Sequence, residues 1–516
     1  MLPPYRPEPY VDFTQEGPRS NMLDAIGCVS KQLGRTYPLR IGGKEITTDQ
    51  KITSICPAAR DQVVGMVSKA SADQAGEAIV TAYEAFKMWS HFDPEGRARI
   101  LFKAAAIMRR RVYELSAWMC FEVSKSWIEA YADVCETIDF LDFYGREMMR
   151  LAGGHPTTPF EGEENEVRYM PLGVVVVIPP WNFPLAICAG MTTAAIVTGN
   201  TVVLKPASTA PVIAAKFAEI MVEAGLPDGV LNFLPGSGSE VGDVLVNHPK
   251  TRLIAFTGSK DVGLEVFKKA AVVHPGQIWL KRTILEMGGK DCIVVDQTAD
   301  LDEAAKGIVA AAFGFQGQKC SACSRLIAHT SIYEELLAKV TEGAQALSIG
   351  HTASAENVFM GAVIDESAYH KINDYIKIGK SEGRTVLADG SVPDNGFFIP
   401  PTIIADVDRH ARIAQEEIFG PVLAVIRGRN FTEMLEIAND TEYGLTGALY
   451  SKNRSRLELA RHDFHVGNLY LNRKCTGALV DVQPFGGFNM SGTDSKAGGR
   501  DYLQLFMQAK TICEQF

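Results

Sequence analysis

The chain of 516 residues is too long for one hydrophobic core, so we expect two or three domains of about 150 residues each. Hydrophobic residues make up 46% of it and charged residues 22%, as in ordinary soluble proteins. The net charge of −10 argues against nucleic acid or an anionic membrane as the main partner. Ten scattered cysteines do not resemble a disulfide scaffold, and the first residues show no signal-peptide pattern, so we expect a soluble cytoplasmic protein.

The first third of the chain predicts irregular structure and strands, followed by helices. Residues 1–60 mix prolines, turn residues and short alternating runs, which suits an arm or a few early strands. Residues 70–149 carry apolar and charged side chains at three-to-four spacing, which predicts helices. Residues 165–170 predict a short strand in an outlying hairpin. The most apolar stretch, residues 173–199, contains three prolines and therefore predicts a strand, loop and helix rather than a membrane span.

Strands and helices then alternate in two series. The first predicts strands at 173–178, 201–205, 230–234 and 253–256, with helices at 185–197, 210–224 and 241–246. The second predicts strands at 292–295, 326–329, 422–426 and 447–450. Such a rhythm is typical of parallel, doubly wound sheets, so the sequence predicts two α/β domains with Glu286 near their junction.

Two loops that follow predicted strands carry candidate binding groups. Residues 179–184 (Pro-Pro-Trp-Asn-Phe-Pro) stand where α/β proteins place ligand sites, and the amide of Asn182 can stabilise an oxyanion; a turn with a buried tryptophan is the alternative. Thr257, Gly258 and Ser259 can direct hydroxyl and backbone donors at a pyrophosphate, although the segment lacks the G-x-G-x-x-G spacing. Lys205, at a strand end, can reach a ribose hydroxyl or phosphate, or it is simply exposed.

The segments around Cys320 and Glu286 carry the chemistry. A thiolate attacks a carbonyl carbon well, and a carboxylate can activate the water that releases the acyl group. The C-x-x-C spacing of Cys320 and Cys323 does not predict a metal or redox site, because no second Cys/His cluster accompanies it; Cys323 is expected in the core. Glu417 and Phe419 can hold a ribose and pack on a nicotinamide ring, with a solvated charge pair at 416–417 as the alternative.

Taken in order, these segments resemble the aldehyde dehydrogenase superfamily across nearly the whole chain. The resemblance implies an aldehyde dehydrogenase-like α/β fold: a cofactor-binding domain (1–150 and 172–285), a catalytic domain (286–494) and a β-hairpin oligomerisation arm (151–171 and 495–516). It implies catalytic roles for Cys320, Glu286 and Asn182. It implies cofactor contacts for Pro180, Trp181, Lys205, Ser208, Gly258, Ser259, Glu417 and Phe419.

A narrower resemblance concerns the substrate. Residues 317–325 and 472–478 are similar to the 1-pyrroline-5-carboxylate dehydrogenases, which oxidise L-glutamate γ-semialdehyde to glutamate in proline catabolism. In that branch the turn matched by Thr476, Gly477 and Ala478 anchors the substrate carboxylate, and adjacent backbone N–H groups suit an anion. The resemblance implies substrate contacts for Ser321, Gly477, Ala478, Lys319, Phe183, Phe485 and Glu136, the last for the amino group, with an ordinary exposed helix glutamate as the alternative.

The resemblance also implies cofactor and partners. NAD is the expected cofactor, but Ser208 stands where many NAD-preferring relatives carry a glutamate, which leaves NADP open. A homo-oligomer built from dimers and a separate proline dehydrogenase partner are expected. The Cys320 thiolate would form a hemithioacetal and then a thioester, with Lys319, a helix N-terminus or Glu286 assisting its ionisation. Two rivals remain: a dehydrogenase for another semialdehyde, such as succinate semialdehyde, and a non-catalytic structural protein with this fold.

Overall fold

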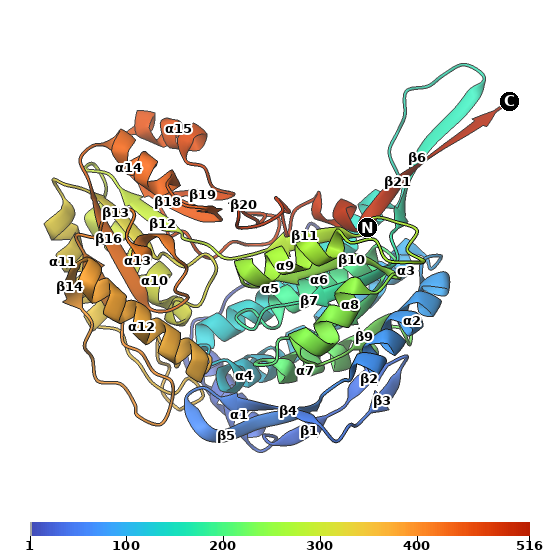
Figure 1. Ribbon diagram of the computed structural model, residues 1–516, viewed down its shortest axis with the longest axis horizontal. Coiled ribbons are helices and arrows are strands. Elements are labelled where there is room, and N and C mark those ends of the chain that lie inside the picture. The colour runs from blue at the N-terminus through green and yellow to red at the C-terminus, as the bar shows by residue number, and fades with distance from the viewer. Residues whose placement is uncertain (1–2) are drawn as a thin grey trace.

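The computed structural model describes residues 3–516 (Figure 1). Its N-terminal part differs from the expectation of an arm and early strands, because helix α1 (Glu16–Ser30) forms there. Met22, Ile26 and Val29 are buried on one face of this helix, which packs on α4 (Val112–Glu122). The expected strands follow α1. They are β1 (Arg35–Tyr37), β2 (Leu39–Ile41), β3 (Lys44–Ile46), β4 (Lys51–Cys56) and β5 (Ala59–Ser68).

The first large sheet has seven strands in the order β11-β10-β7-β8-β9-β2-β3. Its central strands are parallel and buried on both faces, as their continuous apolar runs predicted. The bounds are β7 (Val174–Ile178), β8 (Thr201–Leu204), β9 (Leu231–Phe233), β10 (Thr251–Thr257) and β11 (Arg282–Glu286). The accompanying helices are α2 (Ala72–Trp89), α3 (Pro94–Arg110), α5 (Trp127–Leu151), α6 (Ala186–Val197), α7 (Pro211–Glu223), α8 (Asp243–Asn247) and α9 (Lys260–Ala270).

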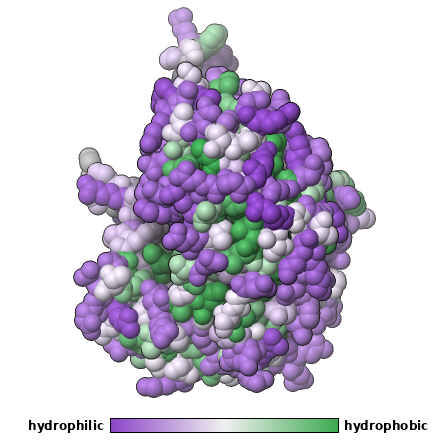
Figure 2. Space-filling view, turned by 90° about the vertical axis from the view of Figure 1, so that its left-hand side faces the viewer, coloured by the Kyte–Doolittle hydropathy of each residue, from purple (hydrophilic) through white to green (hydrophobic). Residues whose placement is uncertain are grey.

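The second large sheet also has seven strands, in the order β14-β15-β16-β13-β12-β18-β19. All of its pairings are parallel except that of β14 with β15. The strands are β12 (Cys292–Val295), β13 (Arg325–His329), β14 (Arg384–Leu387), β15 (Thr402–Ala405), β16 (Val422–Gly428), β18 (Thr446–Tyr450) and β19 (Asn468–Leu471). The helices are α10 (Leu301–Phe313), α11 (Tyr333–Gln345), α12 (Glu366–Glu382), α13 (Arg412–Gln415), α14 (Phe431–Asn439) and α15 (Arg454–Asp463). Figure 2 looks onto this half of the molecule, whose surface is mainly hydrophilic with apolar side chains gathered toward the middle of the face.

Two strands far apart in sequence pair and project from the body. β6 (Glu163–Pro171) and β21 (Met507–Gln515) form an antiparallel ribbon, which stands away from both sheets (Figure 1). The expected hairpin at 165–170 is therefore a ribbon that joins two distant segments. No helix within residues 3–516 is long and apolar enough to cross a membrane.

The remaining elements are short. The helix expected at 241–246 is in part a π-helical turn, η1 (Gly238–Gly242), which continues into α8. Two 3-10 turns, η2 (Gly314–Gly317) and η3 (Tyr502–Phe506), and the strand pair β17 (Tyr443–Gly444) with β20 (Phe488–Asn489) complete the fold. Of these elements η2 bears on the site, because it leads into Cys320.

Candidate active site

The candidate site lies where the first sheet meets the second. The parallel strands β7, β10 and β11 end side by side, with Thr257 opposite Glu286 in the register of β10 and β11. Two cavities adjoin this edge, one of about 140 Å³ and one of about 460 Å³, and both are lined by Cys320, Thr257 and Met287. Cys320 therefore lies where the two cavities meet. This position suits a group that reacts with a ligand in one cavity while a second ligand occupies the other.

The loop that carries Cys320 is held rigidly. Gly317 has a φ of +68°, and a Cβ there would stand 2.3 Å from the carbonyl oxygen of Gly420, so a side chain is excluded. The side chain of Gln316 donates to the carbonyl of Ala362 at 2.8 Å, and that of Gln318 accepts the N–H of Ile364 at 2.9 Å. These buried contacts fix the nucleophile in position before any ligand arrives.

The thiol of Cys320 is not activated in this state. Cys320 is partly exposed, yet desolvation, followed by the charges of Asp291, Glu417 and Glu286, raises the pKa of its thiol. Lys319, one expected source of assistance, donates from Nζ to Glu129 at 2.6 Å. Since its charge is already paired, ionisation of Cys320 depends on proton transfer to a base.

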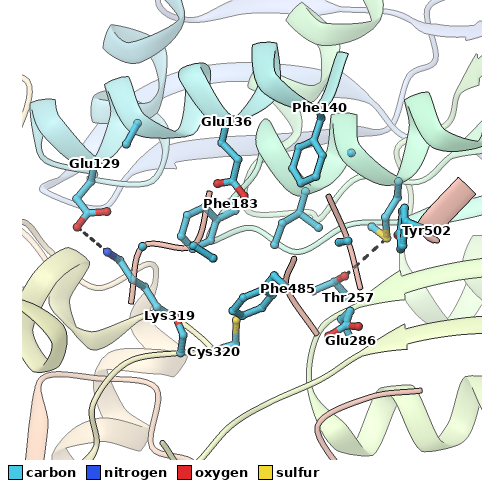
Figure 3. Close-up of a pocket in the computed structure, with 18 of the residues that line it drawn as sticks. Glu129, Glu136, Phe140, Phe183, Thr257, Glu286, Lys319, Cys320, Phe485 and Tyr502 are labelled. Carbon is cyan, nitrogen blue, oxygen red and sulfur yellow. Dashed lines mark hydrogen bonds and ion pairs between the residues drawn. The ribbon is translucent and has the colours of Figure 1, made fainter. Parts of the chain in front are cut away.

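Glu286 ends β11 and points into the smaller cavity (Figure 3). The hydroxyl of Ser495 donates to its Oε1 at 2.5 Å, whereas Oε2 is buried and has no hydrogen-bond partner among residues 3–516. Burial raises the pKa of Glu286 to about 8, against the lowering effect of the Ser495 hydrogen bond. A base whose pKa lies near neutrality, with one unpartnered oxygen on a side chain that lines a cavity, is suited to take a proton from water or a thiol.

Asn182 follows β7 and is buried beside the Cys320 loop. Its Nδ2 donates to the carbonyl of Gln318 at 3.0 Å, and it lines the larger cavity together with Cys320. An amide nitrogen carries two N–H groups, so one donor remains beyond this contact. The alternative of a turn with a buried tryptophan does not describe this loop, because Trp181 is partly exposed and lines the larger cavity.

The remaining expected substrate residues converge on the smaller cavity (Figure 3). Its lining includes Glu129, Glu136, Phe140, Phe183, Thr257, Glu286, Lys319, Cys320, Ser321, Gly477, Ala478, Phe485 and Tyr502. Glu136 comes from the inner side of α5 and faces the cavity, which argues against an ordinary exposed glutamate. Burial and the nearby Asp133 raise its pKa to about 8.

The turn at Gly477 and Ala478 forms one end of this cavity. Gly477 has a φ of +81°, and Arg473 Nη2 donates to the carbonyls of Thr476 and Gly477 at 2.8 and 3.0 Å. With the carbonyls held in this way, the N–H groups of Gly477 and Ala478 donate to no backbone or side-chain acceptor within residues 3–516. Free adjacent N–H groups suit a carboxylate.

The larger cavity contains six of the eight expected cofactor residues. They are Pro180, Trp181, Gly258, Ser259, Glu417 and Phe419. Ser259 is the N-cap of α9, which favours an anion at that helix end. Glu417 accepts the N–H of Gly289 at 3.0 Å, so it is not part of a solvated charge pair, whereas Glu416 pairs with Arg412.

Lys205 and Ser208 do not line either of these cavities. Lys205 is buried at the end of β8, and burial lowers its pKa to about 8, while Ser208 is exposed. They stand on either side of Ala207 in the chain, which does line the larger cavity. Within residues 3–516, no group of three or more His, Cys, Asp or Glu residues is arranged to hold a metal ion.

Sequence reasoning missed several residues that shape the site. Glu129, two helical turns before Glu136 on α5, shares its face and pairs with Lys319. Lys125, in a buried ion pair with Asp133 at 2.6 Å, lies 3.9 Å from the ring centroid of Phe183. The spacing of Glu129 and Glu136 was a usable signal. Nothing in the sequence marked Ser495 as the partner of Glu286.

Comparisons with known proteins extend over the whole chain. A family model described as "Aldehyde dehydrogenase family" matches residues 45–512. The chain is 60% identical over 516 residues to the 1-pyrroline-5-carboxylate dehydrogenase of Geobacillus kaustophilus (strain HTA426), with all of both chains covered. The solved structure of 1-pyrroline-5-carboxylate dehydrogenase from Thermus with bound NAD has 51% identity and a TM-score of 0.98, and covers all of both chains. Proline utilization A (PutA) from Bdellovibrio bacteriovorus has 44% identity and a TM-score of 0.98 over 99% of this chain and 53% of that one.

Proposed function

Because the chain belongs to the aldehyde dehydrogenase family, we propose that it oxidises L-glutamate γ-semialdehyde, the open form of 1-pyrroline-5-carboxylate, to L-glutamate with NAD. One observation carries the proposal: a single cavity joins the thiol of Cys320 and the carboxyl of Glu286 to the free N–H groups of Gly477 and Ala478. A substrate with an aldehyde at one end and a carboxylate at the other would place the aldehyde at Cys320 and the carboxylate at these N–H groups. The relatives named above support the same substrate.

The residues present fit NAD. Glu417 offers carboxylate oxygens for ribose hydroxyls, and the N-terminus of α9 at Ser259 favours a pyrophosphate. Trp181 and Phe419, with ring centroids 5.5 Å apart, provide an apolar wall for the nicotinamide beside Cys320. When bound, NAD supplies the acceptor for the hydride that leaves the aldehyde carbon. Ser208 carries no charge that would repel a 2′-phosphate, so NADP is the second cofactor to test.

Acylation uses Cys320 and Asn182. The sulfur forms a bond to the aldehyde carbon, and the thiol proton passes to a base, for which ionised Glu286 is the carboxylate on the cavity wall. The developing oxyanion accepts hydrogen bonds from the second N–H of Asn182 and the backbone N–H of Cys320. In analogous sites one such donor contributes about 3 kcal/mol. Loss of hydride leaves a thioester on Cys320.

Deacylation uses Glu286. Its free Oε2 takes a proton from a water molecule as the water's oxygen attacks the thioester carbon, and the Cys320 sulfur leaves as thiol or thiolate. Ser495 holds Oε1, which leaves Oε2 without a hydrogen-bond partner within residues 3–516. Glutamate is the product.

Substrate length is set by the far wall. We propose that Gly477, Ala478 and the Ser321 hydroxyl hold the substrate carboxylate, with the Lys319–Glu129 pair beside them. Phe183 and Phe485 confine the methylene chain between the two polar ends. Glu136 is placed to take the amino group.

The assembly and setting belong to the same proposal. The β6–β21 ribbon is a candidate oligomerisation arm, because an exposed two-stranded ribbon offers edges to a second copy. The likeness to one part of proline utilization A supports a proline dehydrogenase as a separate partner protein. Ten free cysteines support a reducing cytoplasm.

The test is direct. The purified protein is mixed with NAD and 1-pyrroline-5-carboxylate, and reduced cofactor is followed by absorbance; we expect turnover that Cys320→Ala abolishes. A higher kcat/KM on succinate semialdehyde than on glutamate semialdehyde would contradict the assigned substrate. Absence of cofactor reduction with both aldehydes would support a non-catalytic protein instead.

A further inference from the structure

An extended N-terminal segment reaches the substrate cavity. Tyr10 lines the same cavity as Cys320, Glu136 and Gly477. The family model matches residues 45–512 and so does not include this segment. A wall of the cavity therefore comes from a part of the chain that the general aldehyde dehydrogenase pattern leaves out, which is where a feature particular to one substrate is expected.

The segment is anchored on the near side of Tyr10. The backbone N–H of Glu8 donates to Asp139 Oδ1 at 2.8 Å, and its carboxylate pairs with Arg109 at 2.6 Å. The carbonyl of Pro9 accepts a weak hydrogen bond from the thiol of Cys135, one residue before Glu136, at 3.9 Å. Tyr10 is thus placed directly along α5.

Two further contacts extend the anchoring to both walls of the cavity. The Phe13 ring lies edge-on to Trp127 of α5, with centroids 5.6 Å apart, and is buried. The hydroxyl of Tyr5 donates to the carbonyl of Val480 at 3.4 Å, two residues after Ala478. The segment is tied to α5 and to the turn expected to bind the carboxylate, so the position of Tyr10 is set independently of any ligand.

Tyr10 stands at the cavity mouth rather than in its interior. Tyr10 is 52% exposed, whereas the Glu136 carboxyl points into the cavity (Figure 3). A tyrosine ring offers a negative face and a hydroxyl, and a neighbouring carboxyl that ionises beside a cation adds a full negative charge. Together the two form an acidic, aromatic corner of the cavity that also contains the Cys320 sulfur.

We propose that Tyr10 is a specificity-determining residue, which together with Glu136 binds the α-ammonium group of an amino-acid aldehyde. The inference rests on the proposed function, because only such a substrate brings a cation next to a carboxylate at this end of the cavity. The Tyr10 ring contacts the ammonium group and narrows the mouth, which keeps water away from the Glu136 contact. Succinate semialdehyde has the carboxylate and the aldehyde but no ammonium, so it gains nothing from this corner.

The experiment compares the two aldehydes on full-length variants. Tyr10→Leu removes the ring at similar bulk and should raise KM for glutamate semialdehyde about 3- to 30-fold, the range of a cation–π contact, with kcat changed less than about twofold. KM for succinate semialdehyde should stay within about twofold. Tyr10→Phe keeps the ring and should retain most of the affinity. Glu136→Gln should show the same selective loss as Tyr10→Leu.

Thr14→Ala is the matched control, because Thr14 is exposed on the same segment and its side chain bonds only Asp12. If Tyr10→Leu raised KM by the same factor for both aldehydes, Tyr10 would merely close the cavity and the inference would be overturned. If it changed KM for neither aldehyde, the inference would also be overturned. If the unaltered protein oxidised succinate semialdehyde but not glutamate semialdehyde, the proposed function itself would fail. Melting temperatures of the variants separate a folding defect from a binding defect.

Discussion

Replacing Ser495 by alanine removes the hydroxyl that donates to Oε1 of Glu286 at 2.5 Å. That hydrogen bond favours the ionised carboxylate, so its loss should raise the pKa of Glu286 further above its value of about 8. A hydrogen bond to a charged group contributes about 1.5–3 kcal/mol. Since one pKa unit corresponds to about 1.4 kcal/mol, the expected rise is about one to two units.

The rate of deacylation should follow the ionised fraction of Glu286. At pH 8 that fraction falls from about half to about 10% or less, so steady-state turnover falls about five- to fiftyfold. Stopped-flow absorbance should show that the first turnover of cofactor reduction slows as well, because Glu286 is also the base for the Cys320 thiol. The pH midpoint of kcat should move to higher pH.

Two variants sharpen the experiment. Ser495→Thr keeps a hydroxyl and should restore the pH midpoint. Thr493→Ala alters the same segment, where Thr493 Oγ1 accepts the N–H of Leu285 at 3.0 Å, but it does not touch the carboxylate and should leave the midpoint in place. A midpoint that stays fixed or moves down in Ser495→Ala would refute the reasoning.

Four further outcomes are expected. Glu286→Gln should raise the melting temperature by an amount that grows between pH 5 and pH 8. Folding raises the pKa of Glu286 from 4.5 to about 8. The unaltered protein therefore loses stability as pH rises through this range, at up to about 1.4 kcal/mol per pH unit, whereas the glutamine variant does not. A difference independent of pH would contradict this. Asn182→Ala should lower the single-turnover rate of cofactor reduction about 10²- to 10³-fold; an unchanged single-turnover rate would assign Asn182 another role. Gly477→Ala places a side chain at a φ of +81°, at a cost of about 1 kcal/mol, and should raise KM about fivefold for glutamate semialdehyde but not for propanal. Deletion of residues 507–516 should reduce the mass measured by light scattering if the ribbon joins subunits, and an unchanged mass would remove that role.

Eight strands of the two large sheets could be predicted from the sequence because they are apolar runs that become buried, whereas β11, β14, β15 and β19 were not expected. Each expected strand lies within two residues of an observed one, from β7 (Val174–Ile178) to β18 (Thr446–Tyr450). A continuous apolar run between helical segments has few other interpretations. The order of the strands within each sheet cannot be predicted from such runs. For example, β2 and β3 come early in the chain but lie at the edge of the first sheet, next to β9.

Helix α1 was missed for a related reason. Its buried residues, Met22, Ile26 and Val29, are few and stand in a largely polar segment, so the stripe is too weak to recognise alone. It is stabilised by packing on α4, which is a tertiary contact. A local sequence pattern predicts a helix that buries many residues, but it does not predict a helix that buries only three.

The site divides in the same way. Groups that react, such as Cys320 and Glu286, stand in glycine-flanked segments that the sequence displays. Their partners lie far away along the chain: Ser495 is 209 residues from Glu286, and Glu129 is 190 residues from Lys319. A serine or a helix glutamate is an ordinary residue until the fold brings it within hydrogen-bonding distance of a buried charge.

Burial accounts for both the stability behaviour and the chemistry of the site. Glu136 and Glu286 line one cavity, and burial is the largest cause raising the pKa of each to about 8. Neutral, apolar side chains at these positions would stabilise the fold more, because a buried carboxyl opposes folding as pH rises above its unfolded pKa. The presence of two acids on the wall of a cavity that also contains a nucleophile is therefore explained by a role in catalysis or substrate binding rather than by a contribution to stability. The pKa that burial gives Glu286 lies near neutrality, where a general base is most effective, and the same burial leaves Glu136 ready to ionise when an ammonium group enters.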